Sequence, residues 1–363
     1  MEENEKINKT AVNGDNNHGG KKYPKLIAAI VAITGMSALS VIGAKKLYDS
    51  FFKRYERPDY AVTAGLYNYE LLRTTLPREE VSFYSGDAKL KGYYYTAKDS
   101  KGLVVLVHGI HAGADDYLPI VEYLIQNKYN VFSFDWTGTY DSEGKSTIGM
   151  CQAVVDLDNA LKHVKSEERF SSQPLFLLGH SCGGYAVTSI LSVHDGIKAC
   201  ASISGVNNCY KIILEKGKQY GGTLASEGAP RVFLDAYQAM LFGDYIKLNA
   251  VKGINESGIP VFVAHGENDK TISFNSQSII CHRAEITNPN VEYYVGTGAT
   301  DGHDSVWHSA RSAAYRIEVD KAAAKIKDYK EKVEFYKTVD NRLYSEINYE
   351  LLDRIIAMYN NSL

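Results

Sequence analysis

One short motif constrains the fold of this 363-residue chain more than any other feature. The mostly apolar stretch 174–178 runs directly into Gly-x-Ser-x-Gly at residues 179–183, and a helix-compatible stretch begins at Tyr185. The two glycines let neighbouring backbone approach closely while Ser181 adopts a strained conformation. This order of strand, sharp turn and helix predicts a hydroxyl raised above a sheet edge, beside the free N–H groups that begin a helix.

Apolar strands alternate with helical stretches on both sides of this motif. The expected strands are a hairpin of 81–84 and 90–96, followed by 103–107, 131–134, 175–178, 197–203, 261–264 and 291–295. Such alternation gives a mostly parallel sheet with helices on both faces, and reactive groups collect at the carboxyl ends of its strands. The predicted fold class is therefore α/β.

Two regions depart from this alternation. Residues 206–258 carry apolar side chains at helical spacing and form too long a stretch for a simple loop. We expect a small helical cap over the face that carries Ser181; a helical insertion on the side of the domain is the alternative. We assign 81–310 to the α/β domain and 311–363 to a C-terminal helical extension with solvated Glu/Lys-rich faces.

The first 80 residues divide into three parts. Residues 1–25 are polar and are expected to be disordered, and 45–80 form a charged and aromatic connector. Between them, 26–44 carry no charge, and as a helix they would span roughly the ~30 Å hydrocarbon core of a bilayer. We expect a membrane anchor there; a cleaved signal peptide and a buried core helix are the alternatives.

Flanking charge hardly discriminates between orientations of this segment, because Lys and Arg are balanced on its two sides. Our hypothesis places the domain outside the cytoplasmic membrane. The net charge of −3, without a Lys/Arg-rich helical stripe, argues against a nucleic-acid partner. The five cysteines are odd in number and lack Cys-x-x-Cys spacing, so they indicate neither a disulfide framework nor a zinc site.

A serine nucleophile needs a base, an acid that orients the base, and donors for developing negative charge. The base candidate is His303, in a Gly-rich loop after the last expected strand, and His308 is the weaker choice. Asp269 is the acid candidate because it follows an apolar strand, where a carboxylate can bind one imidazole nitrogen. Glu267 is the second choice for the acid.

The donors for negative charge are expected to be two backbone N–H groups. One belongs to Cys182, directly after the serine, and the other to Ile110, in the loop after strand 103–107. We expect the Cys182 side chain only to pack. The histidines that adjoin glycines at strand ends are interpreted as structural: His108, His180 and His265.

The chain order Ser181, Asp269, His303 resembles the nucleophile–acid–base order of the α/β-hydrolases. Over residues 81 to about 310 the resemblance also includes His108-Gly109, His265-Gly266 and Gly302-His303. Residues 135–144 are similar to the Asp-x-x-Gly-x-Gly-x-Ser-x-Gly loop of the serine aminopeptidase and monoglyceride-lipase-like branch, with Tyr140 in place of a glycine. The resemblance implies an eight-stranded sheet with an antiparallel second strand, a lid between the sixth and seventh strands, and no cofactor.

The resulting hypothesis is a membrane-anchored serine hydrolase of the carboxylesterase or lysophospholipase-like type. Ser181 would attack a small-molecule or lipid-like acyl ester, His303 would carry the proton, and Asp269 would orient His303. A serine peptidase acting on short peptides is the near alternative, because the same groups cleave amides. A non-catalytic ligand-binding homologue and a scaffold built on the C-terminal helices are the more distant alternatives.

Overall fold

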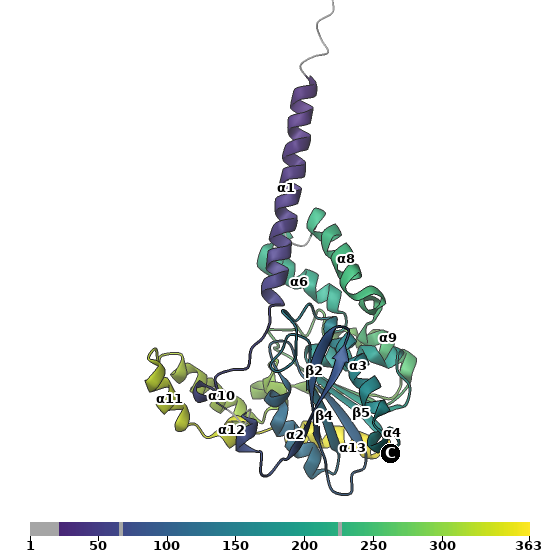
Figure 1. Cartoon of the computed structure of the whole chain (residues 1–363), viewed down its shortest axis with the longest axis vertical. Helices are drawn as coiled ribbons and strands as arrows, with labels where there is room; N and C mark the ends of the chain where they lie inside the picture. Colours follow the sequence, from purple (N-terminus) through teal and green to yellow (C-terminus); the bar gives the residue numbers. More distant parts are fainter. Residues whose placement is uncertain (1–21, 65–67, 224–226) are drawn as a thin grey trace, which may run out of the picture.

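The computed structural model describes residues 22–64, 68–223 and 227–363. Within the first helix, it describes the surroundings of residue 35 and of residues 37–51, and only the backbone elsewhere. The segment 1–21, most of the part expected to be disordered, lies outside the described residues. Helix α1 (Lys22–Phe51) projects from the rest of the molecule (Figure 1). Where side chains are described, no helix is both long and apolar enough to cross a bilayer.

The described strands form one sheet of eight in the order β1-β2-β4-β3-β5-β6-β7-β8. Their bounds are β1 (Arg78–Ser85), β2 (Ala88–Tyr95), β3 (Leu103–Val107), β4 (Asn130–Asp135), β5 (Leu175–His180), β6 (Ile197–Ile203), β7 (Val261–Gly266) and β8 (Val291–Gly296). β2 runs antiparallel to both of its neighbours, and every other pair is parallel. The predicted α/β-hydrolase sheet, with its antiparallel second strand, is confirmed.

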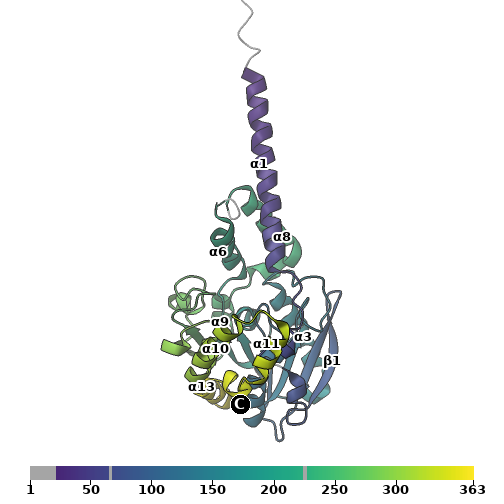
Figure 2. The ribbon, with the colours of Figure 1, turned by 90° about the vertical axis from the view of Figure 1, so that its left-hand side faces the viewer.

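The helices after α1 either pack on the two faces of this sheet or lie beside it. They are α2 (Leu118–Gln126), α3 (Gln152–Ser166), α4 (Glu168–Ser171), α5 (Cys182–Ser189), α6 (Cys209–Gly221), α8 (Ala229–Phe242), α9 (Ala250–Ser257), α10 (Ala310–Ala323), α11 (Tyr329–Lys337), α12 (Asn341–Tyr344) and α13 (Tyr349–Asn360). Residues 206–258, where the sequence predicts a helical cap, contain α6, α8 and α9. α6 and α8 lie beside the C-terminal end of α1 (Figures 1 and 2).

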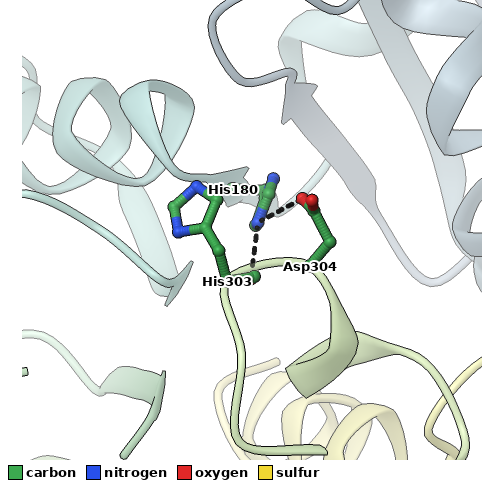
Figure 3. A group of neighbouring side chains, drawn as sticks. All are labelled: His180, His303 and Asp304. Atoms are coloured by element: carbon green, nitrogen blue, oxygen red, sulfur yellow. Dashed lines mark hydrogen bonds and ion pairs between the residues drawn. The ribbon is translucent and has the colours of Figure 1, made fainter. Parts of the chain in front are cut away.

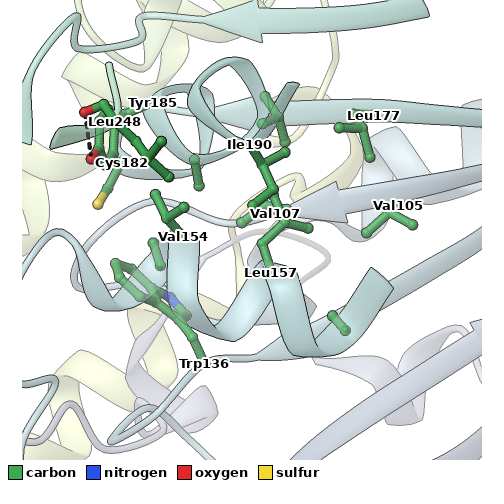
Figure 4. Packing of buried hydrophobic residues seen from close by; sticks show 14 of the residues in the cluster. Val105, Val107, Trp136, Val154, Leu157, Leu177, Cys182, Tyr185, Ile190 and Leu248 are labelled. Atoms are coloured by element: carbon green, nitrogen blue, oxygen red, sulfur yellow. Dashed lines mark hydrogen bonds between the residues drawn. The ribbon is translucent and has the colours of Figure 1, made fainter. Parts of the chain in front are cut away.

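Two apolar layers hold the sheet between the helices. Side chains alternate along a strand, so Val105 and Val107 of β3 face one layer while Val104 and Leu106 face the other. The first layer contains residues of α3 and α5 (Figure 4) and of α9, and the second contains residues of α2 and α13. All five residues of β3 are buried, as expected for a central parallel strand covered on both faces.

The C-terminal helices do not behave as one extension. α10 and α12 share a small apolar cluster of their own, which contains Val319 and Tyr344. α13 instead packs under the sheet, where Tyr359 is fully buried and its hydroxyl donates to the Leu177 carbonyl at 2.7 Å. The boundary expected at residue 310 therefore does not separate α13 from the α/β domain. Charged faces predict that a helix is partly solvated, but they do not show which surface its apolar face covers.

Tyr140, which stands where the related loop has a glycine, adopts a left-handed backbone with φ 38°. Its ring is buried, and its hydroxyl donates to the Asp116 carboxylate at 2.8 Å. Gly113 makes room for the ring, because a Cβ at that position would lie 2.1 Å from a ring carbon of Tyr140. The side chain is thus held by packing and a hydrogen bond that offset its backbone strain.

Candidate active site

Ser181 lies between β5 and α5 in a backbone conformation that few residues adopt, with φ 56° and ψ −117°. The turn depends on its two glycines, because Cβ atoms there would overlap other backbone. A Cβ at Gly179 would lie 2.3 Å from the Gly183 carbonyl oxygen, and one at Gly183 would lie 2.1 Å from that of Val107. The Ser181 N–H donates to the Ile203 carbonyl at 2.8 Å, which ties the turn to β6.

The fold brings Ser181, Asp269 and His303 into one hydrogen-bonded array. His303 Nε2 lies 2.9 Å from Ser181 Oγ, and His303 Nδ1 lies 2.7 Å from Asp269 Oδ2. Asp269 follows β7 and His303 follows β8, so neighbouring parallel strands deliver the acid and the base to the same edge of the sheet. The array has the geometry in which a hydroxyl donates to imidazole and imidazole donates to a carboxylate.

The surroundings of Asp269 keep its carboxyl group ionised. Oδ1 accepts the backbone N–H groups of Thr271 and Ile272 at 2.7 and 2.8 Å, and Oδ2 lies 3.1 Å from His265 Nε2. Burial by itself would raise the pKa of Asp269. The hydrogen bonds from His265, His303 and the backbone outweigh burial, so this pKa lies well below its usual range.

The weaker candidates lie elsewhere. Glu267 is exposed, and Asp269 occupies the position beside the imidazole. His308 is fully buried and packs against Trp307 with 3.7 Å between ring centroids.

The two expected N–H donors belong to segments that adjoin Ser181. Cys182 is the first residue of α5, and the first four N–H groups of a helix have no partner within it. Its side chain is buried and directed at the Met150 carbonyl, 3.4 Å away, which leaves only the backbone facing the site. Ile110 lines the same pocket as Ser181, and a Cβ on the preceding Gly109 would lie 3.2 Å from Ser181 Cβ.

Sequence reasoning missed a link between the two loops that flank Ser181. The Gly109 N–H donates to the Tyr117 hydroxyl at 3.0 Å, and that hydroxyl lies 2.8 Å from His180 Nδ1. His180 Nε2 in turn lies 3.2 Å from the His303 carbonyl oxygen (Figure 3). Tyr117 and His180 therefore connect the loop that carries Ile110 to the loop that carries the imidazole. No sequence signal distinguishes Tyr117 from an ordinary core aromatic residue.

His180, His303 and Asp304 form a cluster of ligand-type side chains among the described residues (Figure 3). Their donor set fits hydrogen bonding better than metal binding. Both ring nitrogens of His303 face Ser181 and Asp269, and His180 Nδ1 faces Tyr117. An ion held here would displace those hydrogen bonds.

Two buried histidines beside the site stay neutral over a wide pH range. Burial lowers the pKa of His108 to about 3, and burial, followed by the charge of His303, lowers that of His180 to about 4. His108 Nε2 accepts the backbone N–H of Trp136 at 3.2 Å, a hydrogen bond that only the neutral ring can accept.

These histidines predict a loss of stability in mild acid. An unfolded histidine has a pKa near ~6.5, so below that pH the unfolded chain takes up protons that the folded chain does not. The stabilisation is complete above about pH 6.5 and is lost as the pH falls toward the folded values. Between pH 7 and pH 5, His108→Gln should lose about 2 kcal/mol less unfolding free energy than the natural chain. Denaturant titrations at both pH values measure this, and equal losses would contradict it.

Comparison with known proteins agrees with this geometry. Residues 98–215 match the family model described as serine aminopeptidase, S33. The uncharacterized protein YfhR of Escherichia coli is 25% identical over 202 residues, which cover 53% of this chain and 64% of YfhR. The lysophosphatidylserine lipase ABHD12 of Danio rerio is 27% identical over 190 residues, which cover 50% of this chain and 47% of that relative. The matched region thus spans less than two thirds of either relative.

A solved structure, that of the Pyrococcus furiosus esterase Pf2001, shares the fold. It aligns with a TM-score of 0.51 at 23% identity and covers 79% of this chain and 98% of the esterase. The sheet order, the strand–turn–helix at Ser181 and the family match agree with one another. The chain has the α/β-hydrolase fold, and its Ser181, His303 and Asp269 are arranged as in a serine hydrolase.

Proposed function

We propose that this enzyme hydrolyses carboxylic acyl esters through an acyl-enzyme formed on Ser181. Its Oγ attacks the ester carbonyl while His303 Nε2 accepts the hydroxyl proton, and Asp269 stabilises the imidazolium that results. The N–H groups of Cys182 and Ile110 bind the oxyanion. His303 returns the proton to the leaving alcohol, and water, activated by the same imidazole, then releases the acid.

The observation that carries this proposal is the position of the array beside an apolar pocket. Ser181 lines a cavity of about 260 Å³ whose walls are mostly aliphatic and aromatic. Such a lining fits an acyl chain. The similar proteins ABHD12, which is named a lipase, and Pf2001, which is named an esterase, agree with an ester substrate.

A peptidase remains the second candidate because the matched family is described as serine aminopeptidase. An aminopeptidase must hold the ammonium group of its substrate, and carboxylates are the side chains suited to that task. Among the described residues that line the pocket, the charged ones are Lys216 and Lys270, and none is Asp or Glu. This lining favours esters over aminoacyl amides.

Ser181→Ala should lower kcat for p-nitrophenyl acyl esters by a factor of about 10³ or more, because the acyl-enzyme can no longer form. A fluorophosphonate probe should label the natural chain and not the variant. Aminoacyl p-nitroanilides, tested beside the esters, separate the two candidates. Faster cleavage of the amides would favour the peptidase, and full ester hydrolysis by Ser181→Ala would refute the assignment of the nucleophile.

Tyr117→Phe should lower kcat roughly 10–100-fold with little change in KM, because the loops that hold Ile110 and His303 lose their connection. The matched control is Tyr129→Phe. That residue is buried like Tyr117, and its hydroxyl donates to the Asn360 side chain at 3.0 Å, away from the site. Equal effects of the two substitutions on kcat would show that Tyr117 serves folding alone.

We also propose that residues 26–44 anchor the enzyme in a membrane, with its domain on the extracytoplasmic side. Support comes from the sequence, which keeps this stretch free of charge between lysines. The protein should stay with membranes through an alkaline carbonate wash, and protease added to intact cells should remove the domain. Extraction by carbonate would contradict the anchor, and full protection from the protease would contradict the orientation.

A further inference from the structure

Part of the cavity beside Ser181 is built by a helix outside the α/β domain. Four residues from the C-terminal end of α1 line it: Ala44, Leu47, Tyr48 and Phe51. Cap residues line it as well, including Ile213 of α6 and Leu234 of α8. Both α1 and the cap therefore contribute walls to the space in front of the hydroxyl.

The end of α1 is fixed in this position by specific contacts. The Tyr48 hydroxyl donates to the Ile148 carbonyl at 2.8 Å and accepts the Gln238 side-chain amide at 2.8 Å. The Phe51 ring lies 5.3 Å from that of Tyr220 on α6. The Phe51 carbonyl lies 2.9 Å from His111 Nε2, in the loop that also carries Ile110. A tether alone would not need these contacts with both the cap and the loop.

The lining specifies what the cavity can hold. At about 260 Å³, it is slightly smaller than the roughly 300–1,000 Å³ of most small-molecule sites, so it accepts one chain rather than two. The helices that line it also carry exposed apolar side chains: Leu39 on α1 and Met240 on α8 are 70% and 72% exposed. Exposed apolar side chains suit contact with a lipid surface.

We propose that the last two turns of α1 form one wall of an acyl-chain site for single-chain esters, so that this helix sets the chain length the enzyme accepts. The inference rests on the proposed esterase function and extends it to a substrate class, monoacyl lipids. Leu47 and Phe51 are then specificity-determining residues, although they lie outside the α/β domain.

The test compares short and long esters on the full chain in detergent micelles. Leu47→Trp fills the cavity, so kcat/KM for p-nitrophenyl laurate should fall about 10–100-fold while that for p-nitrophenyl acetate stays within about twofold. Lys46→Trp is the matched control, because it places the same side chain on the same helix at an exposed position outside the cavity lining. It should leave both esters unchanged. Phe51→Ala, which enlarges the cavity, should shift the preference toward longer chains.

Fluorophosphonate labelling of Ser181 distinguishes a failure of the proposed esterase function from a failure of the proposed acyl-chain wall. If the natural chain is neither labelled nor active on acetate, the proposed function fails. In the other case, the natural chain is labelled and active, while Leu47→Trp changes the hydrolysis of the acetate and laurate esters equally, or changes neither. That result refutes the acyl-chain wall and leaves the esterase function standing. Free lauric acid, which would occupy the acyl-chain site, should slow the labelling of the natural chain and not that of Leu47→Trp. Equal slowing of both would also overturn the proposal.

Discussion

The strained backbone at Ser181 is the constraint on which the site depends. A left-handed conformation at a non-glycine residue costs of order 1–3 kcal/mol and persists only where its surroundings enforce it. Here the enforcement comes from Gly179 and Gly183, which let β3, β5 and α5 approach within contact distance, and from a hydrogen bond to β6. These backbone contacts raise the serine hydroxyl above the sheet edge.

Around this fixed point, the parts of the site are held by different kinds of interaction. Asp269 is buried, yet it stays ionised because four hydrogen-bond donors surround its carboxylate. His303 belongs to a more exposed loop, and the His180–Tyr117 link ties that loop to the segment on the opposite side of the serine. A rigid acid and a doubly supported base leave little reorganisation for the moment of proton transfer.

Helix α1 gives the protein a feature that its α/β domain alone would lack. Its C-terminal end is buried against the cap and the loop that carries Ile110, while its N-terminal part projects from the molecule (Figure 1). This one helix carries both the proposed membrane anchor and the proposed wall of the acyl-chain site. If both hold, the element that places the enzyme at a lipid surface also selects among the chains that the surface supplies.

The sequence by itself determined the mostly parallel sheet and the places where Ser181, Asp269 and His303 follow strands, whereas the antiparallel second strand was implied only by the resemblance to the α/β-hydrolases. Strand periodicity and glycine stereochemistry act locally, and parallel strands end at one edge wherever they lie in the chain. Only the tertiary structure decided that α1 completes the pocket and that α13 completes the second apolar layer. It alone also showed that Tyr117 and His180 connect two loops. An amphipathic pattern shows that a face is buried but not what covers it, because that choice depends on packing between segments distant in sequence.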